Sequence, residues 1–147
     1  MKNKLALYKK INEWIEIAEE DYNVAKLGLS ISSSVSYRII VYHSQQCVEK
    51  YLKAFLVSHQ IDFPYTHNIT MLLDLCSEIH ISFEELRKAE ILTGYAIANR
   101  YPGEYRKIKK ADAIKAVRLA GSVRLFIANM LRTENIKINL PDIKNHT

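Results

Sequence analysis

Residues Tyr37 to Leu56, YRIIVYHSQQCVEKYLKAFL, form a stretch that contains neither Gly nor Pro. Its apolar residues recur at intervals of three, four and seven, which predicts one long helix with a broad apolar face. A dense row of polar residues runs beside that face. Such a helix either joins a hydrogen-bonded network or lines a functional site. The apolar face consists of Ile40, Val41, Cys47, Val48, Tyr51, Leu52, Phe55 and Leu56, and the polar row of His43, Gln46, Glu49, Lys50 and Lys53.

The composition indicates a single all-helical domain. A chain of 147 residues, 48% of them apolar, is large enough to bury one hydrophobic core. It has only 4 Gly and 3 Pro, which together with long periodic runs favours helices over a β-sandwich or an α/β sheet. We therefore expect an all-α protein, an antiparallel four- or five-helix up-down bundle.

Five amphipathic segments are predicted from residue periodicity and from helix start and stop signals. They span residues 8–29, a second helix ending near 59, then 67–79, 82–100 and 110–132. Expected N-caps are Ser33 or Ser34 for the second helix, Thr66 for the third and Ser82 for the fourth. We expect residues 1–133 to form the bundle and residues 134–147 to form a loose polar tail.

The faces of the first and fifth helices follow from the same periodicity. Acidic residues gather on the outer side of the first helix, which we interpret as a solvated face. Its inner side has Ile11, Trp14, Ile15, Ala18, Tyr22, Ala25 and Leu29, and its acidic side has Glu13, Glu16, Glu19, Glu20 and Asp21. The inner side of the fifth helix is predicted to hold Ile114, Val117, Gly121, Leu125, Phe126 and Ala128.

Several classes of protein are disfavoured by the sequence. Cys47 and Cys76 are isolated and lie within helical patterns, so we expect two buried thiols rather than a disulfide or a zinc site. The histidines lack the spacing and the neighbouring carboxylates of a metal site, and no cofactor is indicated. No apolar run is long enough to span a bilayer and no secretory signal is visible. We therefore expect a cytoplasmic protein that does not associate with a membrane.

Positive charge gathers between Arg100 and Arg124, where basic residues far outnumber acidic ones. The formal net charge of +5 permits a polyanionic partner without requiring one. Two interpretations stay open, a solubilising loop or a contact for nucleic acid, in which an interleaved tyrosine such as Tyr101 stacks on an unpaired base. The basic residues at the centre of this run are Arg106, Lys107, Lys109 and Lys110.

Three motifs in order resemble the HEPN domain family of bacteria and archaea. Residues 43–54 keep the pattern H-x-Q-Q-x-x-E-K-x-L-K-A. Residues 66–69 read Thr-His-Asn-Ile, where the family has Thr-His-Asp-Leu, and residues 100–102 read Arg-Tyr-Pro. With the first helix centred on Trp14, the resemblance covers about residues 10–130.

The resemblance implies a compact bundle that is commonly a homodimer. It also implies a partner, because many HEPN proteins are encoded beside a minimal nucleotidyltransferase and act with it as a toxin–antitoxin pair. Active members are metal-independent endoribonucleases with an Arg-x(4–6)-His motif. In that motif the arginine stabilises the charged phosphorane and the histidine moves a proton.

This chain departs from the ribonuclease motif, since no histidine follows Arg100 at the required distance. Arg38 and His43 have the spacing, but they lie in the long second helix. Residues five apart in a regular helix diverge by about 140°, so we interpret this match as a coincidence. Whether the chain is an enzyme therefore stays open, with Arg100 and His43 as candidate catalytic residues.

The polar row of the second helix has two interpretations. His43, Gln46 and Glu49, with Lys53 one turn further, lie on one ridge of the helix. They form either a hydrogen-bonded seam between helices or subunits, or one wall of a cleft for a phosphate-bearing ligand. In the second case Arg100 would bind phosphate oxygens and Tyr101 would stack on the ligand.

Three functional hypotheses follow. The first is a nucleotide- or RNA-interacting module that acts with a nucleotidyltransferase. The second is a metal-independent endoribonuclease toxin with a degenerate Arg/His site, and the third is a structural dimerisation bundle without catalysis. The first requires that the polar row of the second helix and the Arg-Tyr-Pro motif share one pocket.

Overall fold

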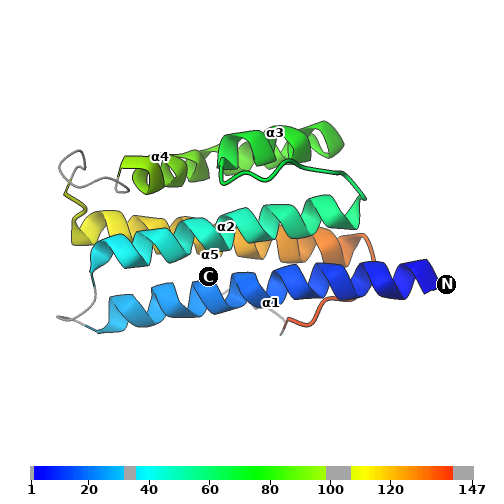
Figure 1. Cartoon of the computed structure of the whole chain (residues 1–147), viewed down its shortest axis with the longest axis horizontal. Coiled ribbons are helices and arrows are strands. Elements are labelled where there is room, and N and C mark those ends of the chain that lie inside the picture. The colour runs from blue at the N-terminus through cyan, green and yellow to red at the C-terminus, as the bar shows by residue number, and fades with distance from the viewer. Residues whose placement is uncertain (1, 32–35, 99–106, 141–147) are drawn as a thin grey trace.

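A computed structural model of the chain describes residues 2–31, 36–98 and 107–140, and every regular element in this part is helical (Figure 1). The side chains of residue 2 and of residues 96–98 are not described. The elements are α1 (Lys2–Ser30), α2 (Tyr37–Ser58), α3 (Ile69–Ile79), the 3-10 helix η1 (Ile81–Glu90), α4 (Ile91–Ala98) and α5 (Lys110–Thr133).

The helices form an up-down bundle around α2, which packs against α1, α3, α4 and α5. In Figure 1, α1 and α2 run in opposite directions, η1 and α4 return the chain, and α5 runs beside α2. The short helix α3 lies on the same side of the bundle as η1 and α4, rather than across its end. The predicted all-α bundle is confirmed.

The apolar face predicted for α2 is confirmed in full. All eight of its residues are at most 1% exposed, and α2 is therefore the central wall of the core. Burying a large aliphatic or aromatic side chain contributes roughly 1.5–3 kcal/mol, so this face supplies much of the stability of the bundle. The predicted inner face of α1 also packs inward, with Trp14, Tyr22 and Leu29 partly buried at the margin.

The inner face predicted for α5 was wrong, because a different side of the helix faces the core. Only Val117 and Ala128 of the predicted residues are buried, and Ile114, Leu125 and Phe126 lie at the margin. The buried face is built largely from small residues, which let α5 approach its neighbours closely. It consists of Ala113, Ala116, Val117, Ala120, Val123, Ile127, Ala128 and Leu131.

The predicted fourth helix is two elements, a ten-residue 3-10 helix followed by α4. Its buried residues Phe83, Leu86, Ala89 and Leu92 are spaced by three throughout. That spacing matches the three residues per turn of a 3-10 helix, so this conformation keeps the first three on one face, and Leu92 follows in the first turn of α4. Its N-cap is His80, whose side chain accepts a hydrogen bond from the Ser82 nitrogen, and the expected Ser82 cap was wrong.

Two other helix starts differ from the expected caps. Asn68 caps α3 by accepting a hydrogen bond from the Met71 nitrogen at 3.2 Å, while Thr66 accepts one from the Asn68 nitrogen just before the helix. Ser36 is the N-cap residue of α2, with no side-chain hydrogen bond to the helix. Ser33 and Ser34 lie outside the described residues.

The segment after α5 packs on α1 rather than lying loose as far as it is described. The Asn12 side chain donates to the Lys137 carbonyl at 3.1 Å and accepts from the Asn139 nitrogen at 2.7 Å. Leu140 is buried, and Ile136 packs against the core. The domain boundary at residue 133 stays a prediction.

No described helix combines the length and the apolar character that crossing a bilayer requires.

Candidate functional site

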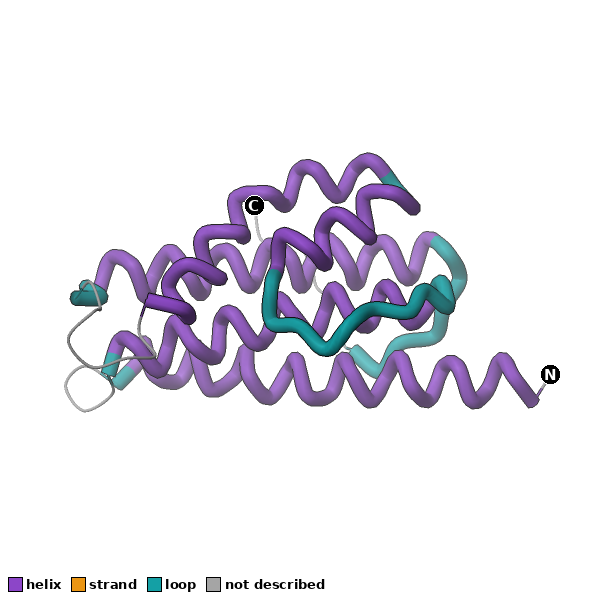
Figure 2. Tube along the Cα trace, turned by 45° about the horizontal axis from the view of Figure 1, so that its top comes forward, coloured by secondary structure: helices purple, strands orange, loops and turns teal. Residues whose placement is uncertain are grey.

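The connection between α2 and α3 determines where the polar row of α2 finds its partners. After α2 ends, the chain runs back along that helix, so that α3 begins beside its middle (Figure 2). Gln45 holds this return, because its Nε2 donates to the His67 carbonyl at 3.1 Å. The Ile69 nitrogen donates to the Thr93 hydroxyl at 3.1 Å, which ties the same segment to α4. His67 is therefore fixed beside α2.

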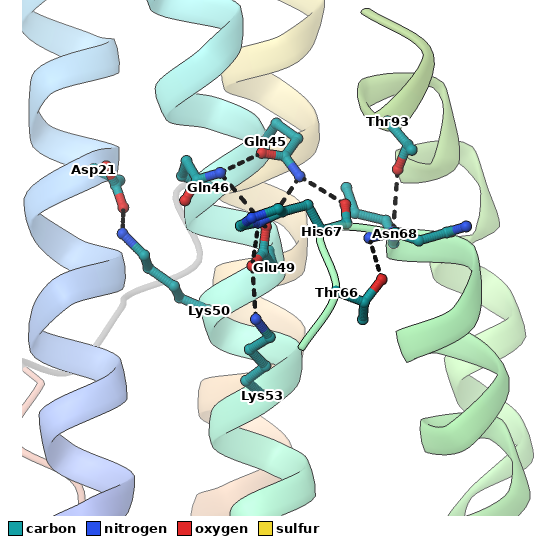
Figure 3. A network of polar contacts seen from close by, with 11 residues as sticks. Asp21, Gln45, Gln46, Glu49, Lys50, Lys53, Thr66, His67, Asn68 and Thr93 are labelled. Atoms are coloured by element: carbon teal, nitrogen blue, oxygen red, sulfur yellow. Dashed lines mark hydrogen bonds and ion pairs between the residues drawn. The ribbon is translucent and has the colours of Figure 1, made fainter. Parts of the chain in front are cut away.

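Glu49 is the centre of a buried polar cluster, which we call the Glu49 cluster (Figure 3). One carboxylate oxygen accepts from Lys53 Nζ at 2.7 Å, and both oxygens lie 3.0 Å from His67 Nδ1. Gln45 Nε2 lies 3.2 Å from the carboxylate, and Gln46 Nε2 donates to Gln45 Oε1 at 2.8 Å. Glu49 is 2% exposed, so these partners replace the water that the carboxylate has lost.

Lys53 is buried between this carboxylate and two aromatic rings. Its Nζ lies 5.5 Å from the ring centroid of Trp14 and 5.6 Å from that of Phe63, and the residue is 5% exposed. The ring faces add an electrostatic attraction to the ion pair with Glu49. Lys53 therefore neutralises the buried carboxylate.

Asp21 is the centre of a second cluster of the same composition, which we call the Asp21 cluster. His43 Nδ1 lies 2.7 Å from one of its oxygens, and Lys50 Nζ forms an ion pair with the other. Asp21 is 8% exposed, so its expected place on a solvated acidic face was wrong. Both clusters thus combine a carboxylate, a lysine and a histidine bound through Nδ1.

The two histidines line one cavity of about 380 Å³. This volume lies near the lower end of the range typical of small-molecule sites, roughly 300–1,000 Å³. The polar side chains around it include Arg38, Gln46 and Tyr95, and none of the described lining residues is acidic. The cavity presents imidazoles, a guanidinium, amides and aromatic rings beside the aliphatic side chains of Ile39, Val41 and Ile108.

Residues of α4 and of the segment before α5 line this cavity. Tyr95 and Ile108 both line it. The Tyr95 hydroxyl donates to Asp112 Oδ1 at 3.1 Å, and Asp112 Oδ2 accepts from the Lys109 nitrogen at 2.9 Å. Asp112 therefore holds the start of α5 against α4.

The sequence-predicted site residues fall into three groups. His43 and Gln46 line the cavity, whereas Glu49 and Lys53 are buried behind His67. A second group is exposed at the start of α5, next to Ile108. The members of that group are Lys107, Lys109 and Lys110. Arg100, Tyr101 and Arg106 lie outside the described residues.

Arg124, at the end of the predicted basic run, is partly buried and pairs with α1. Its guanidinium forms two hydrogen bonds to Glu19, at 2.6 and 2.7 Å, and Glu19 also accepts from the Tyr51 hydroxyl at 2.6 Å. Burial and the neighbouring Glu19 carboxylate raise the pKa of Tyr51, and Glu19 raises the pKa of Arg124. Glu19, like Asp21, is thus bound to partners rather than solvated.

Arg38 and His43 both line the cavity, although their helical positions are expected to diverge. Arginine is long enough to reach around the helix, so angular separation alone does not remove the pair from one site. Our interpretation of the Arg-x4-His spacing as a coincidence used backbone geometry only, and it stays a prediction.

Sequence reasoning missed four residues of the site. His67 was taken as a helix-start residue, yet it binds Glu49 from 18 positions away. Gln45 is 1% exposed and joins α2 to the returning chain. A buried polar residue in the middle of an apolar stripe was the available signal for Gln45. Asp21 and Tyr95 gave no comparable local signal.

Two larger cavities lie elsewhere, but their lining does not converge on a ligand. One, of about 990 Å³, follows the outer face of α1 and contains Glu13, Glu16 and Glu20. The other, of about 800 Å³, lies between the start of α1 and the residues after α2. Among the described residues, no group of three or more histidines, cysteines or carboxylates is placed to hold a metal ion.

Fold and site together define a small helical-bundle protein with buried carboxylate–histidine clusters behind one cavity. The chain belongs to the HEPN domain family, whose model matches residues 11–131. It is also similar to a Methanocaldococcus jannaschii protein with the name "Putative toxin MJ1304", at 32% identity over 134 residues. That match covers 81% of this chain and 86% of the relative. No solved structure matches the chain.

Proposed function

We propose that this chain is a toxin-like HEPN module that binds a nucleotide or single-stranded RNA and acts with a nucleotidyltransferase in the cytoplasm. One observation carries the proposal. Two histidines, each bound to a buried carboxylate, line a single cavity, and none of the described lining residues is acidic. Such a cavity offers nitrogen donors for a phosphate and an apolar, aromatic lining for a base, and its lack of acidic lining residues disfavours a cation.

The start of α5 supports a polyanionic ligand rather than a small neutral one. Lys107, Lys109 and Lys110 are exposed next to Ile108, which lines the cavity. Phosphate contacts by lysines would make binding fall steeply with salt. We propose that Arg100, Tyr101 and Arg106, which the sequence places in the same basic run, belong to this contact.

Binding is tested directly with a labelled single-stranded RNA and a nucleoside monophosphate at low and physiological salt. We expect RNA to bind at low salt and to weaken as salt rises. Replacing Lys107, Lys109 and Lys110 by glutamine should reduce the slope of affinity against salt. If neither ligand binds to the intact chain at low salt, the structural-bundle hypothesis replaces this proposal.

The proposed nucleotidyltransferase partner rests on the family, and the name of one relative supports only the toxin-like part of the proposal. Co-purification of the chain from its native operon, followed by mass spectrometry, tests for a nucleotidyltransferase. We expect that enzyme in stoichiometric amount. Recovery of the chain alone at near-native abundance would contradict this part of the proposal. The proposed ligand binding would then depend only on the binding experiment described above.

A second function, metal-independent cleavage of RNA, is favoured by one observation. Arg38 and His43 line the same cavity, and this pair supplies a cation for a charged phosphorane and a group that moves a proton. Incubation of single-stranded RNA with the chain in excess chelator tests it. Cleavage that is lost in both Arg38→Lys and His43→Gln would establish the activity, and intact RNA would exclude it.

We further propose that the chain forms a homodimer. Apolar side chains are exposed toward the end of α1 and directly after it, including Val24, Leu27 and Ile31. A second copy would cover such residues. Light scattering tests the proposal, with Leu27→Lys expected to shift a dimer toward monomer and a monomeric parent chain contradicting it.

A further inference from the structure

His43 and His67 present the same chemistry to the cavity from two different elements. Each binds a carboxylate through Nδ1, and a carboxylate can only accept a hydrogen bond, so the proton on each ring lies on Nδ1. Within the described part of the chain, neither Nε2 atom has a hydrogen-bond partner. A second proton on either ring therefore creates an Nε2–H donor with a positive charge.

The charges facing the two rings determine what this donor can bind. The carboxylate behind each histidine already pairs with a lysine, Lys50 for Asp21 and Lys53 for Glu49. Each cluster is therefore neutral when its histidine is neutral and carries one positive charge when its histidine is protonated. The remaining ionisable side chains at the cavity are Arg38, Tyr42 and Tyr95. Protonation of both rings thus makes the cavity a site for an anion.

The aromatic residues indicate what accompanies the anion. The Tyr42 ring lies edge-on to the His43 ring at 5.3 Å, and Tyr95, which is held by Asp112, lines the same cavity. Aromatic side chains next to phosphate donors are typical of sites that bind a base and its phosphate together. An anion without a ring would make no contact with these aromatic side chains.

We propose that the cavity is a nucleotide phosphate site in which the protonated Nε2 groups of His43 and His67 donate to the phosphate. This assignment rests on the proposed nucleotide or RNA binding and names the atoms that perform it. Asp21 and Glu49 are positioning residues, which fix the two rings without contacting the ligand. The phosphate belongs either to a free nucleotide or to an RNA strand.

Calorimetric titration of the full chain tests the assignment at about pH 6 and about pH 8, on either side of histidine titration. The probes are adenosine 5′-monophosphate, adenosine, and a short RNA with hydroxyl ends. We expect the monophosphate to bind at least about tenfold more weakly at the higher pH, because charge-assisted hydrogen bonds are lost. Adenosine should show no such pH dependence.

Three variants assign the effect to residues. His43→Gln and His67→Gln should each reduce the pH dependence, whereas His59→Gln should leave it unchanged. His59 is the matched control, because it also pairs with a carboxylate, Glu134 at 2.9 Å, but does not line the cavity. A thermal melt of each variant shows whether it is folded.

A measurement on the unsubstituted chain avoids any variant that does not fold. Imidazole ¹⁵N spectra should show the Nε2 signals of His43 and His67 shifting on addition of the monophosphate at about pH 6, while that of His59 stays in place. If all three signals stay in place, or if affinity does not depend on pH, the assignment is wrong.

The RNA probe separates the two possible sources of phosphate and the two proposals. RNA that shares the pH dependence and competes with the monophosphate indicates a bridging phosphate, and RNA that does neither indicates a free nucleotide. If RNA binds equally at both pH values and in all three variants, the two-histidine site is overturned and RNA binding stands. If no probe binds at low salt, both proposals fail.

Discussion

The Nδ1 atom of His67 lies 3.0 Å from both oxygens of Glu49, although the two residues are 18 positions apart and belong to different elements. This contact joins the buried centre of α2 to the cavity surface, because Glu49 is 2% exposed and His67 lines the cavity. The stability of the bundle and the orientation of the site therefore depend on the same carboxylate.

Glu49→Gln should destabilise the protein strongly. The substitution leaves the Lys53 ammonium buried without its counter-charge, which typically costs about 3–5 kcal/mol. Chemical denaturation of the variant against the parent chain measures the loss. Glu78→Gln is the matched control, since Glu78 is exposed on α3 and should change stability by less than about 0.5 kcal/mol.

A double substitution tests whether the unpaired lysine causes the loss of stability in Glu49→Gln. Glu49→Gln with Lys53→Met removes both charges and keeps the volume between Trp14 and Phe63 filled. We expect it to be more stable than Glu49→Gln alone by about 1 kcal/mol or more. Equal stability of the single and double variants would show that the lost contacts to Gln45 and His67 are the main cause.

Two glycines should respond oppositely to replacement by alanine. Gly94 lies in α4 and a Cβ there would meet nothing within 4 Å, so Gly94→Ala should stabilise by about 0.5–1 kcal/mol. At Gly121 the Cβ would lie 3.0 Å from the Tyr22 hydroxyl, and Arg124 lies over that ring at 4.9 Å. Thermal melts should show Gly121→Ala to be less stable than the parent, and an increase equal to that of Gly94→Ala would contradict this packing.

Asn12 should be the main attachment of the C-terminal segment to α1. Asn12→Ala removes two hydrogen bonds to the backbone of residues 137–139 and should cost about 1–2 kcal/mol. Asn23→Ala, on an exposed part of the same helix, is the control. Hydrogen exchange should increase in residues 135–140 of the Asn12 variant, and unchanged exchange there would mean that apolar packing alone holds the segment.

The two thiols should be inert in the folded protein. Burial raises the pKa of Cys76 to about 12 and raises that of Cys47 as well, so both are neutral thiols at about pH 8. Alkylation at that pH should be negligible until denaturant is added. Fast modification of either cysteine in native buffer would contradict the burial seen here.

The raised pKa of Cys76 also affects the stability of the protein at high pH. The unfolded chain loses the Cys76 proton near pH 9, its unperturbed pKa, while the folded chain keeps it to about pH 12. The unfolded state then binds fewer protons, so the free energy of unfolding should fall between these values. Cys76→Ala should show a smaller fall, and an equal fall would assign the effect to other groups.

The fold was predictable where the apolar pattern was strong and periodic. The face of α2 from Ile40 to Leu56 was correct at every position, because large side chains at helical spacing leave one way to bury them. The face of α5 was misjudged, since half of its buried residues are alanine. Alanine fits the core and the surface equally well, so its spacing carries little information.

The site was only half predictable, because its contacts are long-range. His43 and Gln46 stood out on the ridge of α2, but the partners of the ridge come from α1 and from the loop before α3. Asp21 was indistinguishable from its acidic neighbours until packing placed it at His43. The three-residue spacing from Phe83 to Leu92 did contain a readable signal for the 3-10 helix.

The central claim, that nucleic acid binds at the cavity between α2 and α4, is tested most directly by photocrosslinking. Single-stranded RNA containing 4-thiouridine is crosslinked to the intact chain, and the modified peptides are sequenced. The account predicts crosslinks to Tyr42 and Tyr95, which line the cavity. Crosslinks confined to the outer face of α1, around Glu13 and Glu16, would contradict it.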